Sequence, residues 1–481
     1  MKVVVIDPRF SESAKIADIY LPLKVGTDID LLNLLAIKLI KSGNINNKFI
    51  KNHVNNFDEY KKNLLSLDEG ELLKSTNIPK LIFEEFYNLF IKSENIISAW
   101  TMGLNQSVQG VDKNLALNNI HIITGQINKE GSGPFSLTGQ PNAMGGREVG
   151  GLSTTLAVHL DYNEQNCEKV SKFWKCDNLP SQNGLTAYEM IDKVDVLIIC
   201  HTDPVYHLPN RRFVEEAFKN IDLVVEINAY KGSESSKFSH IQLPALAFGE
   251  KSGTQTNFDR ALVKVTPFKE RENILQDWEI FAKLGEYLGY KDKFSFSSTK
   301  EVFEEYQQMT KLSFKQHLNI FESDFDKLSK EPFIWGKNLY KNNQFLTPNK
   351  KANLHFVINQ NLSQQPSCEF PFILLTGRTR DQWHSGTKTK QEKTLLKYKE
   401  LEFVEINLSD AKNLGVEDGD MVKVSSKRGF LKAKIVIYDI NPKTIFIPIS
   451  HRDINYLTDD KLDPFSFEPD YNHSAVRIEK I

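Results

Sequence analysis

The sequence contains little cysteine, and its cysteines are far apart. Only Cys167, Cys176, Cys200 and Cys368 occur among 481 residues, and no pair has CxxC spacing. Zinc sites and iron–sulfur clusters usually take ligands from closely spaced cysteines. The sequence therefore predicts four free thiols and no metal ligand in any local motif.

Long apolar runs and an excess of one charge are also absent. The longest apolar runs, such as residues 196–200, are far shorter than a bilayer span, and the first residues lack a signal peptide's apolar region and cleavage site. Sixty basic and 62 acidic residues give a net charge of −2. Such a balance offers no electrostatic surface for nucleic acid or anionic lipid. We expect a cytoplasmic protein with no membrane span and no nucleic-acid partner.

The common nucleotide-binding fingerprints are missing. No G-x-G-x-x-G follows a predicted strand, and no GxxxxGK[ST] phosphate loop occurs. Gly131-Ser-Gly133 follows a helical pattern and lacks the third glycine. A nicotinamide cofactor held through the usual fingerprint is therefore not expected.

One stretch, residues 131–151, is dense in glycine. Seven of its 21 residues are glycine, and Thr138, Gln140, Asn142 and Arg147 lie among them. Because glycine weakens helices and strands, this composition predicts a loop. A plain linker is one interpretation, but apolar residues such as Phe135 favour a ligand-facing loop.

Short apolar segments alternate with helical patterns over the first 290 residues. The predicted strands span residues 3–6, 95–100, 195–200, 222–226 and 241–244, and polar residues follow each of them. Alternation of this kind is typical of an α/β fold with doubly wound, mostly parallel, Rossmann-like sheets. Such sheets bind ligands beyond the carboxyl ends of their strands. Five polar strand ends together predict a large ligand.

The pattern changes in the last third of the chain. Residues 291–370 have no regular alternation and are predicted to connect two domains. From residue 371 to 481, short β-rich segments follow one another with turns at Asp418-Gly419 and Arg428-Gly429. This spacing predicts a compact β-barrel.

Six segments resemble a known family. They are WTMGLNQ at 100–106, HIITGQI at 121–127, GPFSLTGQPNAMGGREVG at 133–150, GEKSG at 249–253, TGRTRDQWH at 376–384 and VEDGDMVKV at 416–424. The chain resembles the molybdopterin oxidoreductases of the dimethyl-sulfoxide-reductase superfamily, most closely the catalytic subunit of assimilatory nitrate reductase. Periplasmic nitrate reductases differ within 133–150, which favours the assimilatory, cytoplasmic branch.

The resemblance implies a domain plan and a cofactor. Residues 1–290 would form two interleaved α/β subdomains, truncated at the N-terminus, and residues 371–481 a six-stranded double-psi-type barrel that binds the dinucleotide. The family holds molybdenum between two molybdopterin guanine dinucleotides. Carried over by motif, the expected cofactor contacts are Asp7, Gly26, Thr27, Asp28, Met102, Gln106, Asp203, Asn228, Lys251, Asp277, Thr376, Gly377, Arg378, Thr379, Gln382, Trp383, His384, Ser385, Asn455 and Asn472.

For some of these positions the residue departs from the family's pattern or allows a second interpretation. Family members often have Asp at position 228, and the Asn here lacks the charge for a carboxylate contact with guanine. A Lys-like donor is more usual at position 472. Without their motif, Trp383 and His384 would equally suit a barrel core. Arg147 is the predicted catalytic residue, since a guanidinium presents paired donors to a planar oxyanion such as nitrate. The alternative for Arg147 is a surface salt bridge with Glu148.

The implied reaction is the two-electron reduction of nitrate to nitrite by oxygen-atom transfer, in nitrate assimilation. The family's [4Fe-4S] cysteines precede the region that matches Met1, and no cysteine here matches them. We therefore expect the C-terminal major part of a truncated or split subunit. Its partners would be the missing N-terminal iron–sulfur portion, or the separate polypeptide that carries it, and a donor such as ferredoxin, flavodoxin or an NADH-linked reductase. A non-catalytic remnant and a related enzyme such as formate dehydrogenase are the alternatives.

Overall fold

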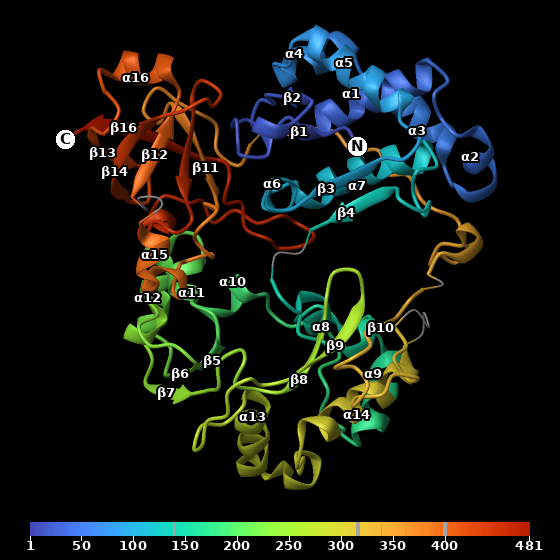
Figure 1. Cartoon of the computed structure of the whole chain (residues 1–481), viewed down its shortest axis with the longest axis vertical. Helices are drawn as coiled ribbons and strands as arrows, with labels where there is room; N and C mark the ends of the chain where they lie inside the picture. Colours follow the sequence, from blue (N-terminus) through green and yellow to red (C-terminus); the bar gives the residue numbers. More distant parts are fainter. Residues whose placement is uncertain (138–139, 314–317, 338, 361, 398–401) are drawn as a thin grey trace. The chain divides into compact units, whose positions relative to one another are not determined.

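The computed structural model describes residues 1–137, 140–313, 318–337, 339–360, 362–397 and 402–481. Thr138 of the glycine-dense stretch lies outside these residues. The chain forms two compact units (Figure 1). The first unit contains Met1–Ser136, Tyr206–Val214 and Asn342–Ile481, and the second contains Leu137–Val205 and Glu215–Lys341.

The first unit begins with an α/β part. Its two small sheets are parallel pairs, β1 with β2 and β3 with β4. The strands are β1 (Val4–Ile6), β2 (Ile19–Leu21), β3 (Ile97–Trp100) and β4 (Gly133–Ser136). The helices are α1 (Asp28–Lys41), α2 (Asn47–His53), α3 (Phe57–Leu64), α4 (Glu69–Thr76), α5 (Lys80–Lys92), α6 (Met102–Asn105) and α7 (Gly110–Ile123). Helix α1 is buried along nearly its whole length because it is apolar on most sides.

The first unit also contains a closed six-stranded barrel. Its strand order is β11-β15-β12-β14-β13-β16, and parallel and antiparallel pairs are mixed. The strands are β11 (Phe372–Gly377), β12 (Phe403–Ile406), β13 (Met421–Ser425), β14 (Phe430–Ile437), β15 (Thr444–Pro448) and β16 (Ser474–Lys480). Two short helices, α15 (Lys393–Leu396) and α16 (Leu408–Leu414), lie between strands. Alternate apolar residues from every strand fill the interior, and closure leaves no open edge.

The second unit contains two three-stranded sheets. One is parallel, in the order β5 (Val196–Cys200), β6 (Leu223–Asn228) and β7 (Ile241–Pro244). The other is antiparallel, in the order β10 (Phe333–Ile334), β9 (Ala261–Val265) and β8 (Gly253–Thr256). Helices around them are α8 (Ala143–Glu148), α9 (Glu164–Trp174), α10 (Ala187–Met190), α13 (Asp277–Gly285) and α14 (Thr299–Met309). Helices α11 (Pro204–His207) and α12 (Arg211–Lys219) lie where the chain passes between the units.

The predicted fold class is confirmed: parallel α/β sheets are followed by a six-stranded barrel. The prediction of an uninterrupted loop over 131–151 is wrong, since β4 and α8 lie within it. Pairing with β3 stabilises β4 despite its glycine. The domain boundaries at 290 and 370 stay a prediction.

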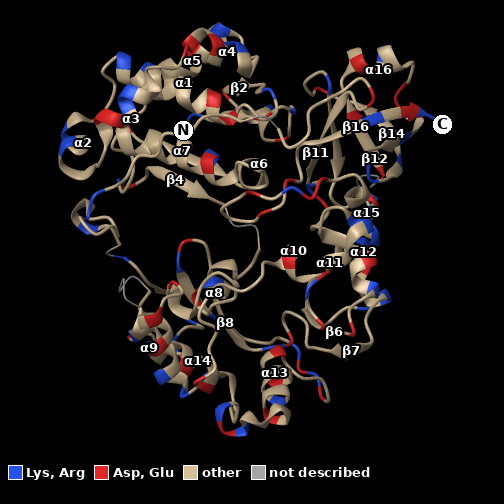
Figure 2. Ribbon diagram, turned by 180° about the vertical axis from the view of Figure 1, so that it is seen from behind, with Lys and Arg blue, Asp and Glu red and all other residues tan. Residues whose placement is uncertain are grey.

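Charge is mixed along the helices of each unit. Figure 2 shows that basic and acidic residues are interspersed along α9, α13 and α14 of the second unit. Among the described residues, no helix has both the length and the apolar character to cross a bilayer.

Candidate functional site

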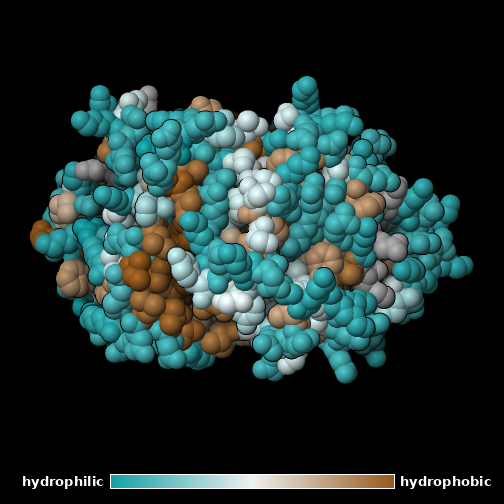
Figure 3. Space-filling model, turned by 90° about the horizontal axis from the view of Figure 1, so that it is seen from below, coloured by the Kyte–Doolittle hydropathy of each residue, from teal (hydrophilic) through white to brown (hydrophobic). Residues whose placement is uncertain are grey.

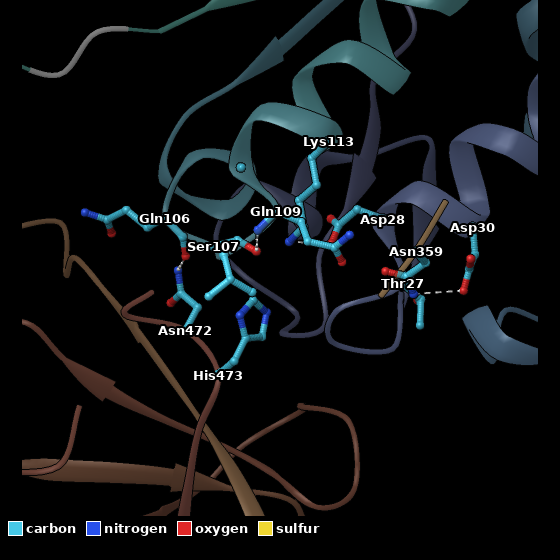
Figure 4. A network of polar contacts seen from close by, with 12 residues as sticks. Thr27, Asp28, Asp30, Gln106, Ser107, Gln109, Lys113, Asn359, Asn472 and His473 are labelled. Carbon is cyan, nitrogen blue, oxygen red and sulfur yellow. Dashed lines mark hydrogen bonds and ion pairs between the residues drawn. The ribbon is translucent and has the colours of Figure 1, made fainter. Parts of the chain in front are cut away.

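In the first unit, a polar network surrounds the N-terminus of α1 (Figure 4). Gly26 has φ of +79°, and a Cβ there would lie 2.0 Å from the Leu362 side chain, so the turn requires glycine. The buried Thr27 hydroxyl donates to the Lys24 carbonyl at 2.7 Å. Asp28 pairs with the fully buried Lys113 of α7 at 2.9 Å. The predicted GTD turn is therefore rigid, and its carboxylate is neutralised.

Gln106 and Asn472 meet in the same network (Figure 4). The Asn472 amide donates to the Gln106 carbonyl at 3.4 Å, and its oxygen accepts from the Thr376 amide at 3.1 Å. The Gln106 side chain donates to Glu468 at 3.1 Å. Burial raises the pKa of Glu468. Three predicted residues far apart in sequence are thus brought together, with Met102 on the adjacent α6.

The segment after β11 holds buried polar atoms without partners. Among the described residues, Thr379 Oγ1, Gln382 Nε2 and His384 Nε2 have no hydrogen-bond partner. Leaving such groups unpaired costs about 1–3 kcal/mol each. Their concentration in one predicted segment fits a polar group that they would contact when it is bound.

Trp383 and His384 are neighbours in this segment, and Trp383 is exposed whereas His384 is half-buried. Their rings are 4.9 Å apart, and Arg378 lies 4.3 Å above the indole. Trp383 is 37% exposed, so the interpretation of it as a barrel-core residue is wrong. Burial, together with the charges of His207 and Arg378, lowers the pKa of His384. The His384 imidazole is therefore neutral at pH 7.

Three other predicted contacts of the first unit, Asn455, Asp7 and Ser385, form hydrogen bonds within the chain. Asn455 is buried and donates to the Tyr206 and His207 carbonyls at 2.6 and 3.1 Å. Asp7 follows β1, and its carboxylate accepts from the Arg9 amide at 2.9 Å. Burial raises the pKa of Asp7 to about 6. Ser385 is buried, and its hydroxyl bonds Thr387.

In the second unit, the end of the parallel sheet carries an ionic cluster. Asp277 accepts from His201 at 2.6 Å and pairs with Lys251. Burial raises the pKa of Asp277, but the hydrogen bonds from His201 and Lys251 outweigh it and hold the value below normal. Two predicted contacts, Lys251 and Asp277, are thus adjacent.

Cys200, His201 and Asp277 are close enough together to hold a metal ion. Burial and the Asp277 charge raise the pKa of the Cys200 thiol to about 11, however. Metals bind the thiolate, and Lys251 already neutralises Asp277. We therefore assign no metal ligand here.

Asp203 and Asn228 are engaged within their own loops. The buried Asp203 carboxylate accepts from the Glu234 amide and from the amide and hydroxyl of Ser235. The Asn228 amide donates to Glu226 at 3.1 Å, and its oxygen accepts from the Tyr230 amide. Their contact with a cofactor stays a prediction.

Arg147 and Glu148 occupy opposite environments on α8. Arg147 is exposed, whereas Glu148 is fully buried. Glu148 accepts hydrogen bonds from Thr256, Tyr306 and Trp335 at 2.8, 2.6 and 2.8 Å. A salt bridge between the two neighbours is therefore the wrong interpretation, because neutral donors occupy the carboxylate. A cavity of about 280 Å³ borders this helix at Met144 and the β8–β9 turn.

Sequence reasoning did not predict the burial of Lys113 and Glu148. Glu148 was considered only as a partner of Arg147. Lys113 lies beside Asp112 and Asn114 on α7, so no local signal indicated that it is buried. No local signal linked Glu148 to Trp335, which is 187 residues away.

Two segments of the chain match known families. Residues 1–287 match the family described as Molybdopterin oxidoreductase. Residues 372–475 match the family described as Molydopterin dinucleotide binding domain. Together, the two matched segments contain all the predicted cofactor contacts, from Asp7 to Asp277 in the first and from Thr376 to Asn472 in the second.

Individual relatives have different names. The chain is 32% identical to a nitrate reductase of Synechocystis sp. over 99% of this chain and 71% of the relative. It is 33% identical to the F420-dependent formate dehydrogenase subunit alpha of Methanocaldococcus jannaschii, over 100% of this chain and 72% of the relative. It is 29% identical to the assimilatory nitrate reductase catalytic subunit of Bacillus subtilis, over 99% and 70%.

A solved structure has the same fold. Acetylene hydratase from Pelobacter acetylenicus superimposes with a TM-score of 0.75, over 100% of this chain and 74% of the other, at 15% identity.

Proposed function

The chain belongs to the molybdopterin oxidoreductase family, and from this premise we propose that it is the larger part of a molybdenum-dependent nitrate reductase. The reaction is the reduction of nitrate by two electrons and two protons to nitrite and water. Similarity to several nitrate reductases supports this substrate, including the assimilatory enzyme of Bacillus subtilis. An assimilatory role would place the protein in the cytoplasm.

The observation that carries the cofactor assignment is the segment 376–385. Its unpartnered buried atoms, on Thr379, Gln382 and His384, fit a polar dinucleotide. The Gln106–Asn472–Thr376 network and the Gly26–Asp28 turn would hold the same kind of group in the first unit. Lys251 and Asp277 would hold the dinucleotide in the second unit. We propose the guanine dinucleotide form, two copies per chain.

Molybdenum carried by the bound cofactor would supply the two-electron oxygen-atom transfer chemistry. The chain's own contribution is to bind and orient the substrate anion. Arg147 can donate two parallel hydrogen bonds to two nitrate oxygens, because its guanidinium is exposed and the Glu148 carboxylate is hydrogen-bonded to other donors. The low pKa of His384 keeps its imidazole neutral, so Nε2 can donate or accept without adding charge.

We further propose that the electrons arrive through an iron–sulfur portion of the enzyme, which is reduced by ferredoxin, flavodoxin or an NADH-linked enzyme. Full-length members of the resembled family carry a [4Fe-4S] cluster. None of the four cysteines here lies in a cluster motif.

The test is an assay of purified chain together with the iron–sulfur portion, combined with molybdenum analysis. We expect bound molybdenum and nitrate-dependent oxidation of a reduced dye. Formate-dependent dye reduction without nitrate activity would instead assign a formate dehydrogenase, which the 33% identity to the Methanocaldococcus subunit makes the second candidate. Absence of molybdenum even in the complete assembly would identify a non-catalytic remnant.

A further inference from the structure

Helix α8 is intrinsically weak. Two of its six residues are Gly145 and Gly146, and glycine is among the poorest helix formers. The helix is shorter than two turns, and Asn142, which precedes it with φ of +62°, makes no side-chain cap. Contacts with the rest of the second unit must therefore fix its position.

Both ends of α8 are attached to one residue, Thr256 of β8. The side-chain oxygen of Asn142 accepts a hydrogen bond from the Thr256 amide at 3.0 Å. At the other end, the Glu148 carboxylate accepts from the Thr256 hydroxyl at 2.8 Å. Thr256 is almost completely buried within its strand. The two hydrogen bonds therefore fix where α8 lies on β8.

Glu148 also determines how α8 is rotated about its axis. Its Oε2 accepts a second hydrogen bond from the Tyr306 hydroxyl at 2.6 Å, and its Oε1 accepts from Trp335 Nε1 at 2.8 Å. Met144, four residues earlier, lies on the same side of the helix and packs against the apolar cluster that contains Phe303 of α14. Met144 and Glu148 thus point inward together.

A fully buried carboxylate is uncommon. Hydrophilic residues cover most of the surface shown in Figure 3, as expected for charged groups, whereas Glu148 is 0% exposed. Burial raises the pKa of Glu148, and its three donors are neutral. An apolar side chain would avoid the cost of burying a charge, but it lacks two acceptor atoms with defined directions. The carboxylate therefore provides orientation.

Arg147 immediately precedes this anchor. Successive residues of a helix point about 100° apart, so fixing Glu148 inward also fixes the direction in which the Arg147 side chain leaves the helix. Arg147 is exposed, and its own packing therefore restrains it little. The orientation of its guanidinium depends on the anchor at the next residue.

We propose that Glu148 is a positioning residue for the anion-binding guanidinium of Arg147, an inference that rests on the proposed function. The carboxylate holds α8 at one rotation through Thr256, Tyr306 and Trp335, so that Arg147 is directed toward the substrate anion before the anion binds. Such preorganisation lowers the entropic cost of ordering a long side chain on binding.

The test is a double-mutant cycle on the complete, molybdenum-loaded enzyme. Glu148→Ala should lower kcat/KM for nitrate by about tenfold or more, mainly by raising KM, since the anion contact loses its orientation. Arg147→Ala removes the contact itself, and adding Glu148→Ala to it should change kcat/KM by less than about twofold. Equal factors in the two backgrounds would overturn the positioning role, because a merely structural residue lowers activity whether or not Arg147 is present.

Two further variants separate positioning from stability. Glu148→Gln should recover most of the lost kcat/KM, because its amide oxygen can accept from Trp335 and its NH2 group can donate to the two hydroxyls. The matched control is Gln307→Ala, next to Tyr306 on α14, since the Gln307 amide donates to the Ser323 carbonyl. It should leave KM unchanged. A Glu148→Gln variant as impaired as Glu148→Ala, or an equal rise of KM in Gln307→Ala, would also overturn the proposal.

Hydrogen exchange of the cofactor-free chain gives a readout that requires no activity. The amides of α8 should exchange about tenfold faster in Glu148→Ala than in the unchanged chain, and at nearly the unchanged rate in Glu148→Gln. Unaltered exchange in Glu148→Ala would show that Glu148 does not anchor α8 and would refute its positioning role. If the complete enzyme oxidises formate and does not reduce nitrate, only the proposed substrate is refuted, and the same cycle is measured with formate.

Discussion

Arg147 is exposed and Glu148 is buried because successive residues of a helix point about 100° apart. Glu148 fixes α8 through three neutral donors, on β8, on α14 and on Trp335 after β10. Burial raises the pKa of Glu148, and the three hydrogen bonds only partly offset the effect. The carboxylate therefore serves as an anchor, and Arg147 is left available for an anion.

We expect Arg147→Lys to lower kcat/KM for nitrate by about 100-fold, because an ammonium cannot form the two parallel hydrogen bonds of a guanidinium. The measurement is steady-state nitrate reduction by the complete enzyme. Arg271→Lys is the control, since Arg271 is exposed in the same unit and pairs with Glu250. Equal values of kcat/KM in the Arg147→Lys variant and the unchanged enzyme would show that another residue binds the anion.

Asp7 should make stability fall as pH rises from about 4 to about 6. Burial raises its pKa from 3.8 to about 6, so the unfolded chain loses this proton before the folded chain does. The favourable contribution is complete below pH 4 and is lost above pH 6. Partial exposure of Asp7 limits it to about 2 kcal/mol.

Thermal unfolding of the cofactor-free chain between pH 4 and 7 tests this contribution. Asp7→Asn should remove the decline and be more stable than the unchanged chain at pH 7. Asp18→Asn, at an exposed ion pair with Lys2, is the control for general charge effects. If the unfolding temperature depended on pH in the same way for Asp7→Asn and the unchanged chain, the prediction would be wrong.

At the scale of elements, the segment after the N-terminal strand is joined to the barrel by a buried ion pair and by backbone hydrogen bonds from Phe10 to Asp439 and from Asn441 to Pro8. Arg9, just after β1, pairs with Glu405 on β12, which is fully buried. The guanidinium also lies over the Phe446 ring at 4.4 Å and the Tyr438 ring at 4.7 Å. The α/β part and the barrel of the first unit are thus joined through residues almost 400 positions apart.

Arg9→Ala should lower the free energy of unfolding by about 3 kcal/mol, because it leaves the Glu405 charge buried without its partner. The Arg9→Ala, Glu405→Gln double variant should recover part of this loss. Urea unfolding monitored by tryptophan fluorescence measures both. Lys15→Ala, at an exposed pair with Glu12, should change stability by less than about 1 kcal/mol. A loss no larger than that of the control would show that neither the ion pair with Glu405 nor the packing of the guanidinium on the two rings stabilises the fold.

At the scale of the whole molecule, predicted cofactor contacts occur in both units. A ligand that binds only the folded state at 1,000 times its Kd stabilises by about 4 kcal/mol. Chain purified from a host that makes the molybdenum cofactor should therefore unfold about 4 °C higher than chain from a host that cannot. Calorimetry with parallel molybdenum analysis measures this difference. Identical transitions and no metal would favour a remnant that has lost the cofactor.

The sequence by itself determined the alternating elements and the family. It predicted strands at 3–6 and 195–200, each within one residue of the observed β1 and β5, since short apolar runs between turns are local signals. The motifs at 133–150 and 376–384 identified the family in the same way. The contacts within the motifs followed from resemblance, and the three free polar atoms at 379–384 are consistent with them.

Only the tertiary structure decided which distant residues meet. It placed Lys113 against Asp28, Asn472 against Gln106 and Trp335 against Glu148. It also gave β16, and it left Val196 and Ile198 of β5 exposed. A buried charge is stable only beside its partner, and an apolar strand face is exposed only if nothing packs on it. Both conditions depend on chain segments that are remote in sequence, and local patterns carry no record of them.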